Sequence, residues 1–169
     1  MADRLTSLAP LLPDGRICAL ILGSFPSQDS LRKQEYYGHA QNQFWRVAEA
    51  CGLIDDAAAP YLERVHQLTG HHVAVWDLYA SVERETSGDD RIRHAVPNDV
   101  DGLWRERGPF PILLNGRRDR EWRRHFAGIP AQTFALPSTS PRPLHWNTPK
   151  SRAAAIEEWR SALAATLGR

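Results

Sequence analysis

The chain has 169 residues, of which 42% are hydrophobic and 24% are charged, and its formal net charge at pH 7 is +1. These values are typical of one globular domain, here residues 1–169, with enough chain to bury a core. A charge so close to zero argues against a protein that coats nucleic acid nonspecifically, but it is compatible with a local basic face. The apolar runs are too short for a membrane span, and residues 1–4 lack the start of a signal peptide, so we expect a cytoplasmic monomer.

The cysteine content gives no sign of a metal centre. Cys18 and Cys51 lie in apolar surroundings and form no CxxC pair. Buried packing thiols are the ordinary interpretation of such residues. Two thiolates cannot hold a four-thiolate iron–sulfur cluster, and no ligand spacing points to zinc. We therefore predict no metal and no cofactor.

The first strand and the loop after it are the most distinctive part of the chain. Residues 1–15 read as an irregular or short helical lead-in. The six apolar residues Ile17–Leu22, bounded by glycine and proline, predict a strand over 16–23 that is buried on both faces. A loop rich in glycine, proline and aromatic residues follows. A helix is predicted from Gln41 or Asn42 to about Cys51, where Gly52 ends it.

The remaining pattern alternates between helices and strands. A helix is predicted from Pro60 to about Gly70, followed by a strand over 71–79 that contains Asp77. Residues 80–97 read as a polar loop with turn residues at 87–90, after which Asn98 is a candidate N-cap for a short helix. Further predicted elements are a strand over 109–115, an arginine-rich helix over 117–127, a strand over 132–136 and a final helix over 149–167.

Alternating strands and helices predict an α/β fold with a parallel sheet covered on both faces. In such a sheet the strand ends meet at one edge, where ligands bind. The predicted strands present Gly23–Ser27, Asp77, Asn115 and Pro137–Pro141 at that edge. We therefore expect these four segments to form one site.

The residues at this edge suit a planar heterocycle attached to a sugar phosphate. Asn42 supplies an amide and Asp77 a carboxylate, while the hydroxyls of 138–140 lie between two prolines. Three aromatic residues are candidate stacking surfaces for a base: Phe25, Tyr37 and Phe44. The chain has no GxxxxGK[ST], GxGxxG or GxSxG motif, so nucleotide hydrolysis, dinucleotide binding and a serine hydrolase have no support.

Taken together, these segments resemble the uracil-DNA glycosylase superfamily, and most closely its hypoxanthine-DNA glycosylase branch and mismatch-specific relatives. The resemblance covers residues from about 16 to 165. It rests on the sequences Gly23-Ser24-Phe25-Pro26-Ser27, Tyr36-Tyr37-Gly38-His39-Ala40-Gln41-Asn42-Gln43-Phe44-Trp45, Trp76-Asp77-Leu78 and Leu136-Pro137-Ser138-Thr139-Ser140-Pro141.

The resemblance implies a three-layer α/β/α fold with a central four-stranded parallel sheet, and removal of a deaminated base from DNA. In other branches an Asp or Asn before the first proline handles the attacking water, but that position is Phe25 here. In the branch that this chain resembles, the catalytic amide maps onto Asn42. Asp77 falls where relatives place a base-contacting Asn, and residues 137–141 fall where the family engages phosphates and the minor groove.

These implied roles give a set of candidate site residues. Asn42 and Asp77 are the catalytic candidates. The base-pocket candidates are Gly23, Ser24, Phe25, Tyr37, Phe44 and Asn115. The DNA-binding candidates are Pro26, Ser27, Ser138, Thr139, Ser140, Pro141, Arg142 and His145. The stretch from Arg142 to Trp146 is bulkier than the family pattern, and His145 is either a phosphate or catalytic contact or a surface residue.

The implied reaction is hydrolysis of an N-glycosidic bond in an extruded nucleotide. Asn42 would orient the water, and Asp77 would read the base edge, stabilise a cationic sugar if ionised, or donate a proton to the departing base. The only lysines, Lys33 and Lys150, lie outside the motifs, so a Schiff-base step is not expected. The preferred base is hypoxanthine or uracil. A G:U/G:T mismatch glycosylase and a noncatalytic nucleic-acid-binding relative are the alternatives.

Each candidate also has a purely structural interpretation. Asn42 is a suitable helix cap, and Asp77 is a suitable cap or partner for an arginine. Phe44 is as typical of a core as of a stacking surface, and Trp45 is expected in the core. The five arginines between 117 and 124 are expected to form a solvated helix face, with phosphate contact as the second interpretation.

Overall fold

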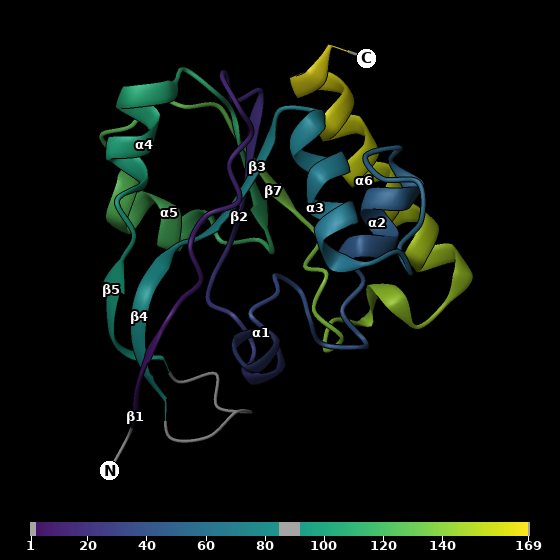
Figure 1. Cartoon of the computed structure of the whole chain (residues 1–169), viewed down its shortest axis with the longest axis horizontal. Coiled ribbons are helices and arrows are strands. Elements are labelled where there is room, and N and C mark those ends of the chain that lie inside the picture. The colour runs from purple at the N-terminus through teal and green to yellow at the C-terminus, as the bar shows by residue number, and fades with distance from the viewer. Residues whose placement is uncertain (1–2, 85–91, 169) are drawn as a thin grey trace.

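The computed structural model describes residues 3–84 and 92–168. Its centre is a four-stranded parallel sheet in the order β3-β2-β6-β7. The strands are β2 (Ala19–Gly23), β3 (Val73–Asp77), β6 (Ile112–Asn115) and β7 (Thr133–Leu136). The helices are α1 (Gln28–Lys33), α2 (Phe44–Ala50), α3 (Tyr61–Gly70), α4 (Val100–Arg107), α5 (Asp119–Phe126) and α6 (Pro149–Leu167), with a 3₁₀ turn η1 (Leu144–Trp146). Figure 1 shows the central strands between the two groups of helices.

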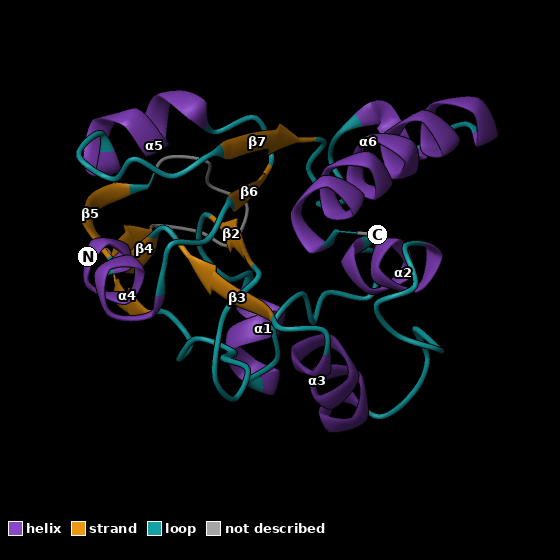
Figure 2. Ribbon diagram, turned by 90° about the horizontal axis from the view of Figure 1, so that it is seen from above, coloured by secondary structure: helices purple, strands orange, loops and turns teal. Residues whose placement is uncertain are grey.

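The central strand β2 explains why the protein has two cores. All five of its residues are buried, and alternate side chains point to opposite faces of the sheet. Ala19 and Ile21 belong to one hydrophobic cluster, whereas Leu20 and Leu22 belong to the other. The first cluster includes residues of α2, α3 and α6, and the second includes residues of α4 and α5. Figure 2 shows these two groups of helices on opposite sides of the central sheet. The predicted three-layer α/β/α architecture with four parallel strands is thus confirmed.

Two expectations about the rest of the chain were wrong. The lead-in contains a strand, β1 (Asp3–Thr6), and the predicted loop over 80–97 contains β4 (Tyr79–Arg84) and β5 (Arg93–Pro97). These strands form a second, antiparallel sheet in the order β1-β4-β5. Its strands carry mixed polar residues without a continuous apolar run, and β1 pairs with β4 across some 75 residues, so local pattern could not reveal it. The turn expected at 87–90 lies outside the described residues.

Some helix boundaries also differ from the prediction. Helix α1 was not predicted, because its six residues are too few for a visible periodicity. Helix α2 begins at Phe44 rather than at Gln41 or Asn42. Asp99 rather than Asn98 caps α4, where its carboxylate accepts the N–H of Gly102 at 2.9 Å. The final helix spans the predicted residues. No helix of the described ranges has the length and apolar character that crossing a membrane requires.

The loop after β7 is held by hydrogen bonds from three sides. The indole Nε1–H of Trp159, on α6, donates to the Pro137 carbonyl at 2.9 Å, and that of Trp146 donates to the Ser138 carbonyl at 3.0 Å. The N–H of Gln43, at the start of α2, donates to the Thr139 carbonyl at 2.8 Å. Because buried carbonyls need partners, these contacts fix the loop over the end of the sheet.

We predict that Trp159→Phe destabilises the protein by about 1–3 kcal/mol, since it leaves the buried Pro137 carbonyl without its donor and reduces the packed volume. Trp159 is 1% exposed. Urea denaturation followed by fluorescence or circular dichroism measures the change. Leu62→Ala, at a position that is 78% exposed, is the matched control and should stay within about 0.5 kcal/mol of the parent.

Candidate active site

A cleft of about 1050 Å³ opens at the carboxyl ends of the parallel strands. All the candidate site residues line it except Phe44 and His145. The predicted convergence of four strand ends therefore exists. Further lining residues come from elements that the sequence analysis did not assign to the site: Tyr79, Arg84, Ile92, His94, Ala95, Arg118, Glu121, Arg124 and His125.

Asp77 lies at the floor of this cleft, at the end of β3. It is 4% exposed, and its Oδ2 accepts a hydrogen bond from the Ser7 hydroxyl at 3.3 Å. It pairs with Gly23 in the parallel register. A Cβ added at Gly23 would stand 2.5 Å from Asp77 Oδ1, so only glycine leaves room for the carboxyl group here.

Burial sets the protonation of Asp77. Removal from water raises its pKa from the ordinary 3.8 to about 7, and the Ser7 hydrogen bond and the nearby charge of Arg118 only partly oppose this rise. Near neutral pH the carboxyl group therefore exists in both forms. It is suited to accept a hydrogen bond when ionised and to donate one when protonated.

Tyr37 stands beside Asp77 in an uncommon backbone conformation, with φ of 55°. Its ring stacks on Phe44 with 4.0 Å between centroids, and its hydroxyl is shielded from solvent and has no acceptor for its proton among the described residues. Burial and the neighbouring Asp77 raise the pKa of this phenol, so it remains a proton donor. Phe44 is 1% exposed and supports Tyr37 from behind, so the expectation that Phe44 itself stacks on a base was wrong.

Asn42 is half-buried at the cleft, just before α2. Its Oδ1 accepts the backbone N–H of Phe44 at 2.9 Å, and its own N–H donates to the His39 carbonyl at 2.9 Å. The first contact is a local turn that fixes the side chain just before α2, whereas the helix N-cap is Gln43, so Asn42 is not the cap that the structural interpretation expected. The two contacts use one lone pair of the amide oxygen, so its second lone pair and its Nδ2–H₂ group are still available for a water molecule.

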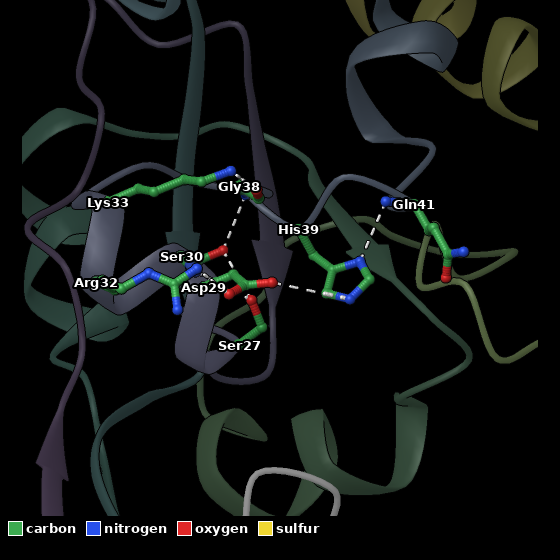
Figure 3. Close-up of polar contacts among 8 residues, drawn as sticks. All are labelled: Ser27, Asp29, Ser30, Arg32, Lys33, Gly38, His39 and Gln41. Carbon is green, nitrogen blue, oxygen red and sulfur yellow. Dashed lines mark hydrogen bonds and ion pairs between the residues drawn. The ribbon is translucent and has the colours of Figure 1, made fainter.

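Helix α1 lies in the segment between β2 and α2, and Figure 3 shows the polar contacts around it. Ser27 caps α1 by accepting the N–H of Ser30 at 3.1 Å. Ser30 Oγ accepts the N–H of Gly38 at 2.9 Å, and Lys33 Nζ donates to the Gly38 carbonyl at 2.8 Å. Gly38 is thus held at both its backbone groups, which fixes the chain between Tyr37 and Asn42.

Asn115 has a positioning role. Its Nδ2 donates to Thr139 Oγ1 at 2.9 Å, and its Oδ1 accepts the Thr139 N–H at 3.0 Å. Asn115 is 5% exposed and Thr139 1% exposed. These two hydrogen bonds join β6 to the loop after β7. They use one N–H and one lone pair of the amide, so the place of Asn115 in the base pocket stays a prediction.

Phe25 occupies the position where related branches carry an acidic or amide residue. Its ring packs against the second hydrophobic cluster, and the Arg84 guanidinium lies over it at 5.3 Å from the centroid. Arg84 Nη1 also donates to the Pro26 carbonyl at 3.4 Å. The loop is therefore anchored to the second sheet by packing, and Phe25 forms a wall of the cleft.

The loop after β7 forms one rim of the cleft with Ser138–Arg142. Beyond it, the side chain of Leu144 is 76% exposed. His145 does not line the cleft; its carbonyl accepts the Ser151 hydroxyl at 2.8 Å and its ring stands edge-on to Trp146. The surface interpretation of His145 thus fits its position better than direct participation.

We predict that stability depends on pH through Asp77. Between pH 4 and 7 the folded protein keeps a proton that the unfolded chain loses, so the free energy of unfolding falls as pH rises through this window. At pH 8, Asp77→Asn should be more stable than the parent by roughly 2–4 kcal/mol, and at pH 4 the two should be nearly equal. Urea denaturation across pH 4–8 measures this. Parallel curves for the two proteins would refute a raised Asp77 pKa.

Comparison with known proteins assigns the chain to a family. The family model of the uracil DNA glycosylase superfamily matches residues 10–164. A hypoxanthine DNA glycosylase of Methanosarcina acetivorans is 38% identical over 135 residues, covering 78% of this chain and 84% of the relative. One of Methanosarcina barkeri is 31% identical over 123 residues, covering 72% and 77%.

A solved structure gives the same result. The solution NMR structure of a Methanosarcina acetivorans protein with the provisional name uracil DNA glycosylase is 30% identical. It superposes with a TM-score of 0.75 and covers 94% of this chain and 98% of its own. The chain belongs to the uracil DNA glycosylase superfamily.

Proposed function

We propose that this protein is a monofunctional DNA glycosylase, which extrudes a deaminated nucleotide and hydrolyses its N-glycosidic bond, with hypoxanthine or uracil as the base. The observation that carries the proposal is a cleft lined both by an amide, Asn42, just before α2, and by a buried carboxyl group, Asp77, at the end of β3. Both named relatives are hypoxanthine DNA glycosylases, and that supports hypoxanthine as a substrate.

Asn42 is the proposed water-orienting residue. Its amide is fixed by the Phe44 N–H, so it can hold a water molecule in one orientation toward the anomeric carbon. Phe25 cannot polarise water, and the amide of Asn115 is held by Thr139 at both its nitrogen and its oxygen, so we assign the water to Asn42. Asp77, buried at the floor, is proposed to face the base.

The positions of the two lysines support simple hydrolysis. Lys33 Nζ donates to the Gly38 carbonyl, and Lys150 is not among the residues that line the cleft. A lysine that forms a Schiff base must reach the anomeric carbon. Hydrolysis by water, without a lyase step, is therefore the proposed reaction.

We predict that Asn42→Ala lowers the single-turnover rate of base release by about 10²–10³-fold, since the water loses its orienting group. The substrate is a duplex with one deoxyinosine or deoxyuridine, in the presence of chelator, and released base is quantified. Asn42→Asp keeps an oxygen for the Phe44 N–H and separates loss of the amide from loss of the helix start. Gln41→Ala, on the exposed neighbour, is the matched control.

The same assay distinguishes the alternatives. A panel of duplexes with hypoxanthine, uracil, xanthine or mismatched thymine identifies the preferred base, and release only from G:U and G:T pairs would indicate the mismatch enzyme. DNA binding without release from any of these duplexes would support a noncatalytic protein. Full activity of Asn42→Ala would contradict the assignment of Asn42.

Leu144 is proposed to assist extrusion. Apolar side chains that enter a base stack lower the cost of unstacking, and Leu144 is exposed next to the rim of the cleft. We predict that Leu144→Ala reduces base release from duplexes about 5–20-fold but affects single-stranded substrates by less than about twofold, because unpaired nucleotides need no wedge. An equal loss on both substrates would assign Leu144 to another role.

A further inference from the structure

Two buried hydrogen-bond donors of residues that interact electrostatically with Asp77 have no acceptor among the described residues. One is the Tyr37 hydroxyl and the other is the Arg118 Nε–H group. Each atom is shielded from solvent, and both residues line the cleft. An unsatisfied buried donor costs about 1–3 kcal/mol, so two in one cleft call for a physical reason.

The chain around Arg118 brings its side chain to the end of the sheet. Gly116 has φ of 100°, and the Arg118 N–H donates to the Gly116 carbonyl at 2.8 Å, which turns the backbone before α5 begins. A Cβ added at Gly116 would stand 3.3 Å from Arg118 Nε, so the guanidinium stem passes close over this glycine. Arg118 Nη1 is held by Glu121 at 3.1 Å, which fixes the side chain in place.

Arg118, Tyr37 and Asp77 form one electrostatic group. The Arg118 charge acts on the buried Asp77 carboxyl and on the Tyr37 phenol, lowering the pKa of each against the larger effect of burial. Tyr37 and Asp77 both lie next to Gly23. A Cβ added at this glycine would stand 3.3 Å from the Tyr37 hydroxyl and 2.5 Å from Asp77 Oδ1. The floor thus combines two spare donors with one carboxyl group that can accept.

This arrangement matches the chemical change that deamination makes in a base. Deamination replaces an amino group, which donates, by a carbonyl oxygen, which accepts, and the adjacent ring nitrogen gains a proton. Resting on the proposed function, we propose that Arg118 Nε–H and the Tyr37 hydroxyl are specificity-determining donors for that carbonyl oxygen. The ionised Asp77 accepts the adjacent ring N–H. An amino group at the same place would face donors and be rejected.

The depth of the group favours a base over a phosphate as its partner. Asp77 is 4% exposed, and an anionic phosphate beside a buried carboxylate would be repelled at low dielectric. The exposed side chains of the rim, such as Arg142, are better placed for the backbone of DNA. A neutral base with one acceptor and one donor on the same edge suits the floor.

The test compares binding of hypoxanthine with binding of purine, which lacks both the C6 carbonyl oxygen and the adjacent ring N–H, and the variants then separate the contact to the oxygen from the contact to Asp77. Duplexes carry either 2′-fluoroarabino-inosine or 2′-fluoroarabino-purine at one position, since the fluorine keeps the glycosidic bond intact during the measurement. Fluorescence anisotropy gives the two dissociation constants. The parent should bind the inosine duplex about 10–100-fold more tightly, the range expected for hydrogen bonds to a charged donor.

The variants assign this preference to residues. Arg118→Met and Tyr37→Phe should each lower the inosine preference at least threefold and leave binding of the purine duplex unchanged. Arg120→Met removes the same charge from an exposed position of α5 outside the cleft and should keep the preference. Tyr37→Phe removes only the hydroxyl, so it still tests the preference if Arg118→Met destabilises the protein.

Two results would overturn the inference. One is a preference that both variants retain, and the other is an equal loss of affinity for both duplexes, which would point to a phosphate contact. Base release from a cleavable deoxyinosine duplex tests the proposed function separately. If the parent prefers inosine and both variants lose that preference, but no base is released, only the proposed glycosylase activity is contradicted. If base is released and both variants keep the full inosine preference, only the proposed role of Arg118 and Tyr37 is contradicted.

Discussion

The site depends on the parallel register that places Gly23 next to Asp77. Because Gly23 has no side chain, a carboxyl group can occupy the end of the neighbouring strand without contact with water. That burial raises the Asp77 pKa to about 7 and gives the cleft a group that changes protonation in the neutral range. On the other side of β2, the parallel pairing with β6 brings Asn115 and Arg118 to the same edge.

The polar groups around this floor divide into two kinds. Asn115, Ser27 and the indoles of Trp146 and Trp159 use their hydrogen bonds to hold loops in position. Other groups have donors or acceptors without a partner among the described residues: Asn42, Tyr37 and Arg118. Polar groups that are hydrogen-bonded within the protein make the cleft rigid. Polar groups with an unpaired donor or acceptor are available to hydrogen-bond a nucleotide. The replacement of a polar residue by Phe25 fits this division, because Phe25 anchors its loop by packing under Arg84.

The central sheet and its strand ends could be predicted from sequence because each buried strand is a local apolar run, as in Ile17–Leu22. The same reasoning placed Asn42 and Asp77 at one edge. It failed for β1, β4 and β5, whose stability comes from pairing between distant segments and not from local pattern. It also failed for Arg118. The five arginines read as one helix face, but α5 begins only at Asp119, and Arg118 lies in the turn before it, where its N–H donates to the Gly116 carbonyl.

The roles of single atoms could not be derived from sequence for a physical reason. Whether an amide is engaged or free depends on contacts such as that between Asn115 and Thr139, which are 24 residues apart. Whether Phe44 faces a base or the core depends on the stacking of Tyr37 over it. The residue types therefore predicted which chemical groups line the cleft, whereas the three-dimensional contacts show which of these groups are hydrogen-bonded or packed within the protein.

The most direct measurement is the structure of the protein bound to a duplex that carries 2′-fluoroarabino-inosine. We expect the inosine to be extruded into the cleft, with its C6 carbonyl oxygen within 3.2 Å of Arg118 Nε or the Tyr37 hydroxyl as ordinary hydrogen bonds require, and with Asn42 beside the anomeric carbon. The assignment of this site would be contradicted by an inosine that remains stacked in the duplex. It would also be contradicted by an inosine that binds anywhere other than in the cleft lined by Gly23 and Thr139.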